Sequence, residues 1–211
     1  MDNEFLDLVL KRLAKRYGYN VHTQLRHVNE AELFAAVLLS PQCTDKQVNN
    51  TTKVLFKHFK SFRDYADADL KTLRSYLKGI NYYKTKAKHL KESAKMIVTR
   101  YNGKLPNHIN ELMELPGVGR KVANVVLNEA FGIDEGIAVD THAATVARRL
   151  HLSRSKNANK IEQDLLRMVP KEKWGMVSNL FIELGRDTCK ARNKECFRCA
   201  LKDICPSSDV K

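Results

Sequence analysis

Hydrophobic residues recur along most of this chain with the spacing of amphipathic helices. Asn29 and Glu32 form a capping pair ahead of one such stretch, and Pro41 follows its end. Gly79 follows the segment that begins at Leu70 and is expected to cap it. The other helices are predicted at 44–59, 70–77, 83–101, 109–115, 121–130, 141–150, 158–168 and 171–186. No stretch alternates polar and apolar residues for long enough to suggest a sheet, so the predicted fold class is all-α.

Composition narrows the class of protein. The chain has 211 residues, of which 43% are hydrophobic and only 9 are Gly and 5 Pro, as expected for one large folded domain or two small ones. Its longest apolar run, 33–39, is far shorter than the roughly 20 residues that a membrane helix needs. The N-terminus carries no secretory signal. We therefore expect a cytoplasmic, nucleoid-associated monomer with no membrane partner.

The charge balance favours an anionic partner. Lys and Arg number 37 against 24 Asp and Glu, which gives a formal net charge of +13. The positive residues are scattered along the chain rather than gathered in a tail. Nucleic acid is the leading partner, while solubility alone is the other reason for a basic surface.

Four of the five cysteines crowd into the C-terminal segment with the spacing C-x6-C-x2-C-x5-C; they are Cys189, Cys196, Cys199 and Cys205. This segment has little apolar content, so it needs a crosslink to hold its shape. A reducing compartment favours metal over disulfides, and four thiolates suit either Zn(II) or an iron–sulfur cluster. The spacing leaves both open. The fifth, Cys43, is expected to be a small core residue.

Basic residues lie between these cysteines, namely Lys190, Arg192, Lys194 and Arg198. They are candidates to offset a negative metal–thiolate centre or to contact a phosphate backbone. An exposed loop with solvated charges is the alternative.

A glycine turn, LPGVGRK at residues 115–121, joins two predicted helices. Gly117 and Gly119 permit positive φ and a close approach of another backbone. A tight turn that leads into a helix N-terminus directs several N–H groups outward and can cradle a phosphate, which makes Gly117, Val118, Gly119 and Arg120 candidate DNA contacts. An ordinary hairpin of two helices also uses glycine.

Lys121 falls in the first turn of the second helix, where a cation opposes the helix dipole. Stability alone favours Asp or Glu there, which points to a functional role. The dipole and partial desolvation favour a neutral, nucleophilic amine, and phosphate binding is the competing role.

Asp140, within VDTH at residues 139–142, precedes a predicted helix as an N-cap. Its carboxylate is also suited to accept a proton from a lysine or to stabilise a cationic sugar. We expect His142 to complete the cap.

Together these features resemble the endonuclease III family of helix-hairpin-helix DNA glycosylases. The matching segments are LPGVGRKVANVVL at 115–127, VDTH, Gly185-Arg186, the cysteine spacing, LLSPQCTD at 38–45 and INYYKTKA at 80–87. The resemblance implies two helical lobes with a DNA-binding cleft between them. Residues 25–135 would form a six-helix barrel with the helix-hairpin-helix, and 1–24 with 136–211 the other lobe. It also implies that the four cysteines hold one [4Fe–4S] cluster rather than zinc.

The resemblance further implies removal of oxidised pyrimidines from duplex DNA and cleavage at abasic sites. Lys121 would attack C1′ of the extruded nucleotide, assisted by Asp140, and the strand would break by β-elimination. Gln42 would fill the gap that the nucleotide leaves, with Tyr82 near the opposing wedge position. Relatives often have an aliphatic residue at Tyr82 and bulkier residues at 143–144, where this chain has two alanines.

Two other functions remain open. A mismatch-specific or monofunctional glycosylase is one, although such relatives usually lack a lysine at the hairpin position. A non-catalytic DNA-binding protein held together by zinc is the other.

Overall fold

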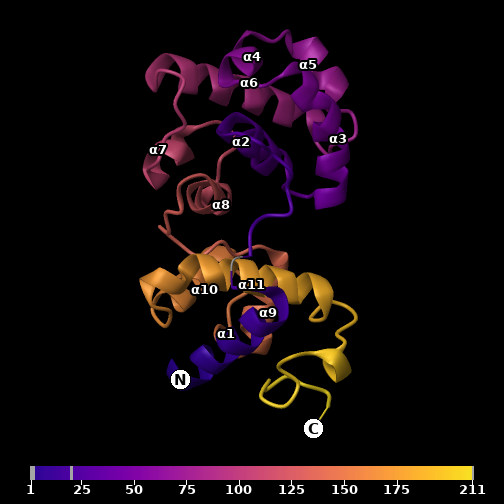
Figure 1. Cartoon of the computed structure of the whole chain (residues 1–211), viewed down its shortest axis with the longest axis vertical. Coiled ribbons are helices and arrows are strands. Elements are labelled where there is room, and N and C mark those ends of the chain that lie inside the picture. Colours follow the sequence, from indigo (N-terminus) through magenta and orange to yellow (C-terminus); the bar gives the residue numbers. More distant parts are fainter. Residues whose placement is uncertain (1–2, 20, 211) are drawn as a thin grey trace. The chain divides into compact units, whose positions relative to one another are not determined.

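The computed structural model describes residues 3–19 and 21–210 (Figure 1). These residues are mainly helical and form no β-strand, apart from one isolated bridge between Cys189 and Lys194, which confirms the all-α prediction. None of the described helices is long and apolar enough to cross a bilayer.

The chain divides into two compact units, Thr23–Ile133 and Met1–His22 together with Asp134–Lys211. The two junctions follow residues 22 and 133, while the resemblance implies junctions after residues 24 and 135.

The unit Thr23–Ile133 is built around one buried helix. It consists of α2 (Glu30–Leu39), α3 (Asp45–His58), α4 (Phe62–Asp67), α5 (Leu70–Tyr76), α6 (Tyr83–Arg100), α7 (Ile109–Glu114) and α8 (Arg120–Phe131). All residues of α2 except Glu30 are buried, because its apolar side chains cover every face rather than one stripe. Figure 1 shows α2 between α6 and α8, and it packs against both and against α3.

The sequence predicts six helices in this unit, and the structure adds α4. Its six residues are too few to show a helical period, but its start carries a recognisable signal. The Ser61 side chain accepts from the Asp64 N–H, and the Asp64 carboxylate accepts from the Ser61 N–H. This reciprocal capping box, together with the buried Phe62 and Tyr65, holds a helix too short to be stable alone.

Gly79 is not the cap that the sequence suggests. The helix α5 ends at Tyr76, and Leu77 follows it with φ −97°, so no left-handed residue is needed there. A Cβ on Gly79 would lie 3.0 Å from Thr51 Oγ1, and the Gly79 carbonyl accepts from Gln47 Nε2 at 2.5 Å. Glycine is therefore required because the turn lies close against α3.

The other unit contains α1 (Asn3–Tyr17), α9 (Thr141–Arg149), α10 (Ala158–Leu166) and α11 (Trp174–Asp187), with short 3-10 turns at Lys171–Lys173 and Cys196–Arg198. In this unit α11 packs against both α9 and α1 (Figure 1). Its core includes Leu13 of α1, Val146 of α9 and Phe181 of α11, all fully buried.

Asp187, at the end of α11, ties three segments of this unit together. Its carboxylate accepts from Tyr17 Oη at 2.8 Å, from Arg16 at 3.1 Å and from Arg198 at 2.8 Å. Burial acts to raise the pKa of Asp187, but these hydrogen bonds outweigh it and hold the pKa below its ordinary value. The C-terminal loop is thereby attached to α1 through one side chain.

Candidate active site and cysteine cavity

The turn between α7 and α8 has a buried side and an open side. Leu115 and Val118 are 2% and 6% exposed, and the Val118 N–H donates to the Leu115 carbonyl at 3.0 Å. Gly117 has φ +80°, whereas Gly119 has φ −90°, so only Gly117 uses the left-handed region. A Cβ on Gly119 would have nothing within 4 Å. The side chain and the amide of Val118 both serve the turn itself, and a contact of Val118 with DNA stays a prediction.

The turn rests on α6. Ser93 Oγ donates to the Pro116 carbonyl at 2.9 Å, and a Cβ on Gly117 would lie 2.6 Å from Nδ1 of His89. Both contacts come from one helix, so α6 positions the turn.

Gly117→Ala is expected to destabilise the protein, because alanine would be forced into left-handed backbone and its methyl group would overlap the His89 ring. The backbone effect alone is about 1–2 kcal/mol. Gly119→Ser is the matched control, since serine caps helices well and its Cβ enters open space. Urea unfolding of both variants measures the difference, and equal losses of stability would contradict this account of the turn.

Lys121 lies in the first turn of α8, as the sequence predicts. Arg120 begins the helix, Gly119 offers no side-chain cap, and the first turn has no acidic residue. Two cations thus join the positive end of the helix dipole, an arrangement that favours an anion outside the protein. Lys121 and Arg120 are both half-buried.

Asp140 is the N-cap of α9, which confirms that prediction. Its Oδ1 accepts from the N–H groups of His142 and Ala143, each at 2.8 Å, and Oδ2 takes part in neither bond. His142 completes the cap through its backbone. A Cβ on Gly185 would lie 2.7 Å from the His142 Cβ, so this glycine lets α9 and α11 approach closely.

Gln42 and Tyr82 both have left-handed backbone, with φ 59° and 57°, and both are exposed. Gln42 lies in the turn between α2 and α3, and Tyr82 immediately precedes α6. The structure brings these two turns together, because Asn81 Nδ2 donates to the Gln42 carbonyl at 2.5 Å.

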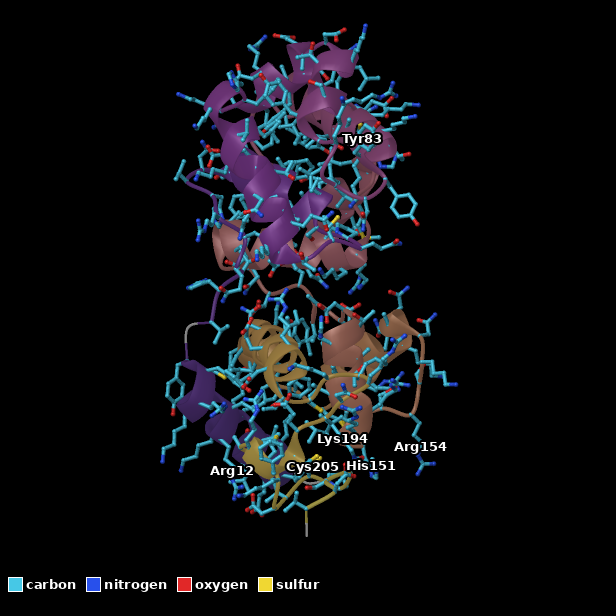
Figure 2. All side chains as sticks on the ribbon, turned by 90° about the vertical axis from the view of Figure 1, so that its right-hand side faces the viewer. Arg12, Tyr83, His151, Arg154, Lys194 and Cys205 are labelled. Carbon is cyan, nitrogen blue, oxygen red and sulfur yellow. The ribbon has the colours of Figure 1, made fainter. Side chains whose placement is uncertain are left out.

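The four C-terminal cysteines line one cavity. Lys194 and Cys205, both labelled in Figure 2, belong to its wall, and Leu150 and Leu184 add apolar surface. Burial raises the pKa of the Cys199 and Cys205 thiols, and charge on the neighbouring cysteine sulfurs raises it further. Four thiolates are by their chemistry a suitable donor set for a metal cofactor, whereas their arrangement in this structure does not form a metal-ion site. Within 3–19 and 21–210, no three or more His, Cys, Asp or Glu side chains are arranged to hold a metal ion.

Arg149, at the end of α9, is a residue of this cavity that the sequence does not indicate. Its guanidinium donates to Cys189 Sγ at 3.2 Å and to the carbonyls of Cys189, Lys190 and Ala191 at 2.9–3.0 Å. No local pattern marks such a partner, because it lies 40 residues before Cys189.

Known proteins resemble both the sequence and the fold. Residues 35–171 match the HhH-GPD superfamily of base excision DNA repair proteins. Endonuclease III of Bacillus subtilis is 44% identical over 183 residues, which cover 86% of this chain and 83% of that protein. The chain belongs to the endonuclease III family. It is therefore a DNA glycosylase of base excision repair with AP lyase activity.

Solved structures of the endonuclease III family agree with this assignment. A trapped endonuclease III–DNA covalent intermediate superposes with a TM-score of 0.91 at 38% identity, covering 98% of this chain and 97% of the other. A non-covalent endonuclease III–DNA complex gives the same TM-score and identity, with 98% and 96% covered.

The cations that the sequence assigns to DNA in this family member differ in their surroundings. Lys194 donates to the Ser207 carbonyl at 2.7 Å and pairs with Asp209, which raises the pKa of Lys194. Lys190 pairs with Glu195 at 3.2 Å. Arg192 is exposed. Lys190 and Lys194 are thus each paired with an acidic residue of the same loop, and Lys190 and Arg192 are both exposed.

Proposed function

We propose that this protein removes oxidised pyrimidines from duplex DNA and cleaves the strand at the resulting abasic site, with Lys121 as the nucleophile. The observation that carries this proposal is the position of Lys121 in the first turn of α8, beside the open Gly119 and with no acidic residue in that turn. A phosphate backbone can approach there, and the helix dipole favours the neutral amine that attack requires.

The reaction begins with extrusion of the damaged nucleotide, because C1′ is out of reach within the duplex. The neutral amine of Lys121 then bonds to C1′, the glycosidic bond breaks, and the base leaves with the bonding electrons. Asp140 takes up the proton that the amine loses and stabilises the positive charge on the sugar. Its Oδ2 suits this role, since the helix cap uses Oδ1.

Strand cleavage follows from the covalent intermediate. The nitrogen lone pair forms the C1′=N bond of a Schiff base while the C1′–O4′ bond breaks and O4′ takes up a proton. This Schiff base makes the C2′ proton acidic, so a base can remove it. The electrons of that C–H bond form a C2′–C3′ double bond and expel the 3′ phosphate, and water later releases the lysine.

Duplex DNA is held by groups of two kinds in this proposal. Gln42 and Tyr82 project from left-handed turns and enter the base stack around the extruded nucleotide. The candidate contacts to the phosphate backbone are Gly117, Val118, Gly119, Arg120 and His142 at the two helix starts, and Lys190, Arg192 and Lys194 in the cysteine loop.

We further propose that Cys189, Cys196, Cys199 and Cys205 hold a [4Fe–4S] cluster. Their shared cavity and the guanidinium of Arg149 on Cys189 Sγ support a thiolate-bound centre with net negative charge. When bound, the cluster crosslinks a segment that has little core of its own. Arg149 and Asp187 attach the crosslinked loop to α9 and α1.

Borohydride reduction during turnover tests the function. The protein is incubated with duplexes that carry different oxidised pyrimidines, an abasic site or no lesion. A protein–DNA adduct is expected with the damaged duplexes, because borohydride reduces the Schiff base to a stable amine, and none with undamaged DNA. Base release without an adduct would show a monofunctional glycosylase instead.

A further inference from the structure

Lys86 of α6 has a buried ammonium group that bonds to no carboxylate. Lys86 is only 8% exposed. Its Nζ donates to the Leu39 carbonyl at 2.7 Å, to the Pro41 carbonyl at 2.6 Å and to Cys43 Sγ at 3.5 Å. An ammonium group has three protons, and each of them has an acceptor here. Burial lowers the pKa of Lys86, which shows that the charge is held at a cost.

The acceptors explain why a cation is tolerated at this place. The helix α2 ends at Leu39 and has no basic residue in its last turn. Carbonyl groups at a helix C-terminus carry partial negative charge and lack partners within the helix. Lys86 supplies the missing cation from a different helix.

The same bonds hold the turn that carries Gln42. A non-glycine residue at φ 59° is strained and keeps this backbone only if its surroundings hold it there. The two carbonyls that flank the Gln42 Cα are both fixed, that of Pro41 by Lys86 Nζ and that of Gln42 by Asn81 Nδ2. Cys43 Sγ on the far side of the turn accepts from Lys86 and from the Asn81 N–H.

Lys86 also bonds to the second exposed turn. Its backbone N–H donates to the Tyr82 carbonyl at 3.1 Å, in the first turn of α6. This backbone bond is the i→i−4 bond of the helix and forms whichever residue stands at 86, whereas the Lys86 side chain acts on the Gln42 turn.

We infer that Lys86 is a positioning residue for lesion recognition, whose side chain fixes the Gln42 turn in the geometry that enters the base stack. This inference rests on the proposed function. Turns that are already ordered save the entropy of ordering them when the nucleotide leaves the stack. Loss of Lys86 thus slows removal of a stacked base more than cleavage at a site whose base is already absent.

The test compares Lys86→Met with a matched lysine of the same helix. Lys91 Nζ also donates to two backbone carbonyls, those of Ala66 at 2.9 Å and Ala68 at 2.5 Å, but far from the two turns in the sequence. Single-turnover rates are measured for excision of an oxidised pyrimidine and for strand cleavage at a preformed abasic site. Lys86→Met is expected to lose about tenfold or more in excision and less than about threefold in cleavage, and Lys91→Met to leave the ratio of the two rates unchanged.

Equal losses in both reactions, or the same change of ratio in Lys91→Met, would overturn the positioning role while the proposed function stood. Failure of the wild-type protein to excise or cleave would instead overturn the proposed function. If Lys86→Met does not fold, Asn81→Ala decides, because Asn81 is exposed and its side chain donates to the Gln42 carbonyl. Asn81→Ala is expected to shift the ratio in the same direction, and an unchanged ratio would overturn the inference.

Discussion

Lys121→Gln and Asp140→Asn are each expected to bind damaged duplex with nearly the affinity of the wild-type protein and to lose strand cleavage. Glutamine cannot form a Schiff base, so the strand-cleavage rate of Lys121→Gln is expected to fall about a thousandfold or more. Asparagine cannot accept the amine proton, and a loss of about a hundredfold or more follows from the missing base. Binding by fluorescence anisotropy and single-turnover cleavage on an abasic duplex measure the two effects separately.

Both substitutions are expected to preserve the fold. Asparagine caps helices as well as aspartate does, so the N-cap of α9 survives in Asp140→Asn. Glutamine removes a cation that opposes the α8 dipole. Arg120→Gln serves as the control for charge, since it is expected to weaken binding and to keep the cleavage rate at saturating DNA. Full strand cleavage by Lys121→Gln would remove the mechanism.

Cys199→Ser is expected to lose the proposed iron–sulfur cluster and, with it, the order of the C-terminal loop. Serine is a poor ligand for iron, and the loop has little apolar packing to replace the crosslink. We expect loss of the brown colour and visible absorption, and rapid proteolysis between Thr188 and the C-terminus. The helical core that surrounds Phe181 is expected to persist in circular dichroism, because its buried residues lie mostly in α1, α9, α10 and α11 and the cysteines are only partly buried against it.

Cys43→Ser is the matched control for the cluster, since Cys43 belongs to the other unit and lies outside the cysteine cavity. It is expected to keep the colour and iron content of the wild-type protein. A colourless wild-type protein that contains stoichiometric zinc would contradict the cluster and favour a zinc-held loop.

The sequence alone identified most helices and their caps, because these depend on residues within one or two turns of each other. Asn29 and Thr44 cap α2 and α3 through their side chains, and Asp140 caps α9. The helix α4 could also have been predicted from its local sequence, through the Ser61–Asp64 capping box. Gly79 was misjudged because a glycine after a helical stretch reads as a cap, whereas its real constraint is the distant Thr51 side chain.

Some of the candidate functional residues can likewise be recognised from local sequence, and others depend on tertiary contacts. Lys121 and Asp140 can be recognised from the neighbouring sequence. Lys121 is a cation in the first turn of α8, where it opposes the helix dipole, and Asp140 is the N-cap of α9. The burial of Val118 and the partners of Lys194 depend on how the turn and the loop fold back on themselves.

The bonding partners of Lys86 and Arg149 are visible only in the tertiary structure. Lys86 bonds to a carbonyl 47 residues away and Arg149 to a sulfur 40 residues away. A long flexible side chain gives no periodic signal, and its partners become acceptors only once a helix ends or a loop closes beside it. Local sequence thus determined the helices and the reactive groups, and packing between distant segments determined which side chains hold them in place.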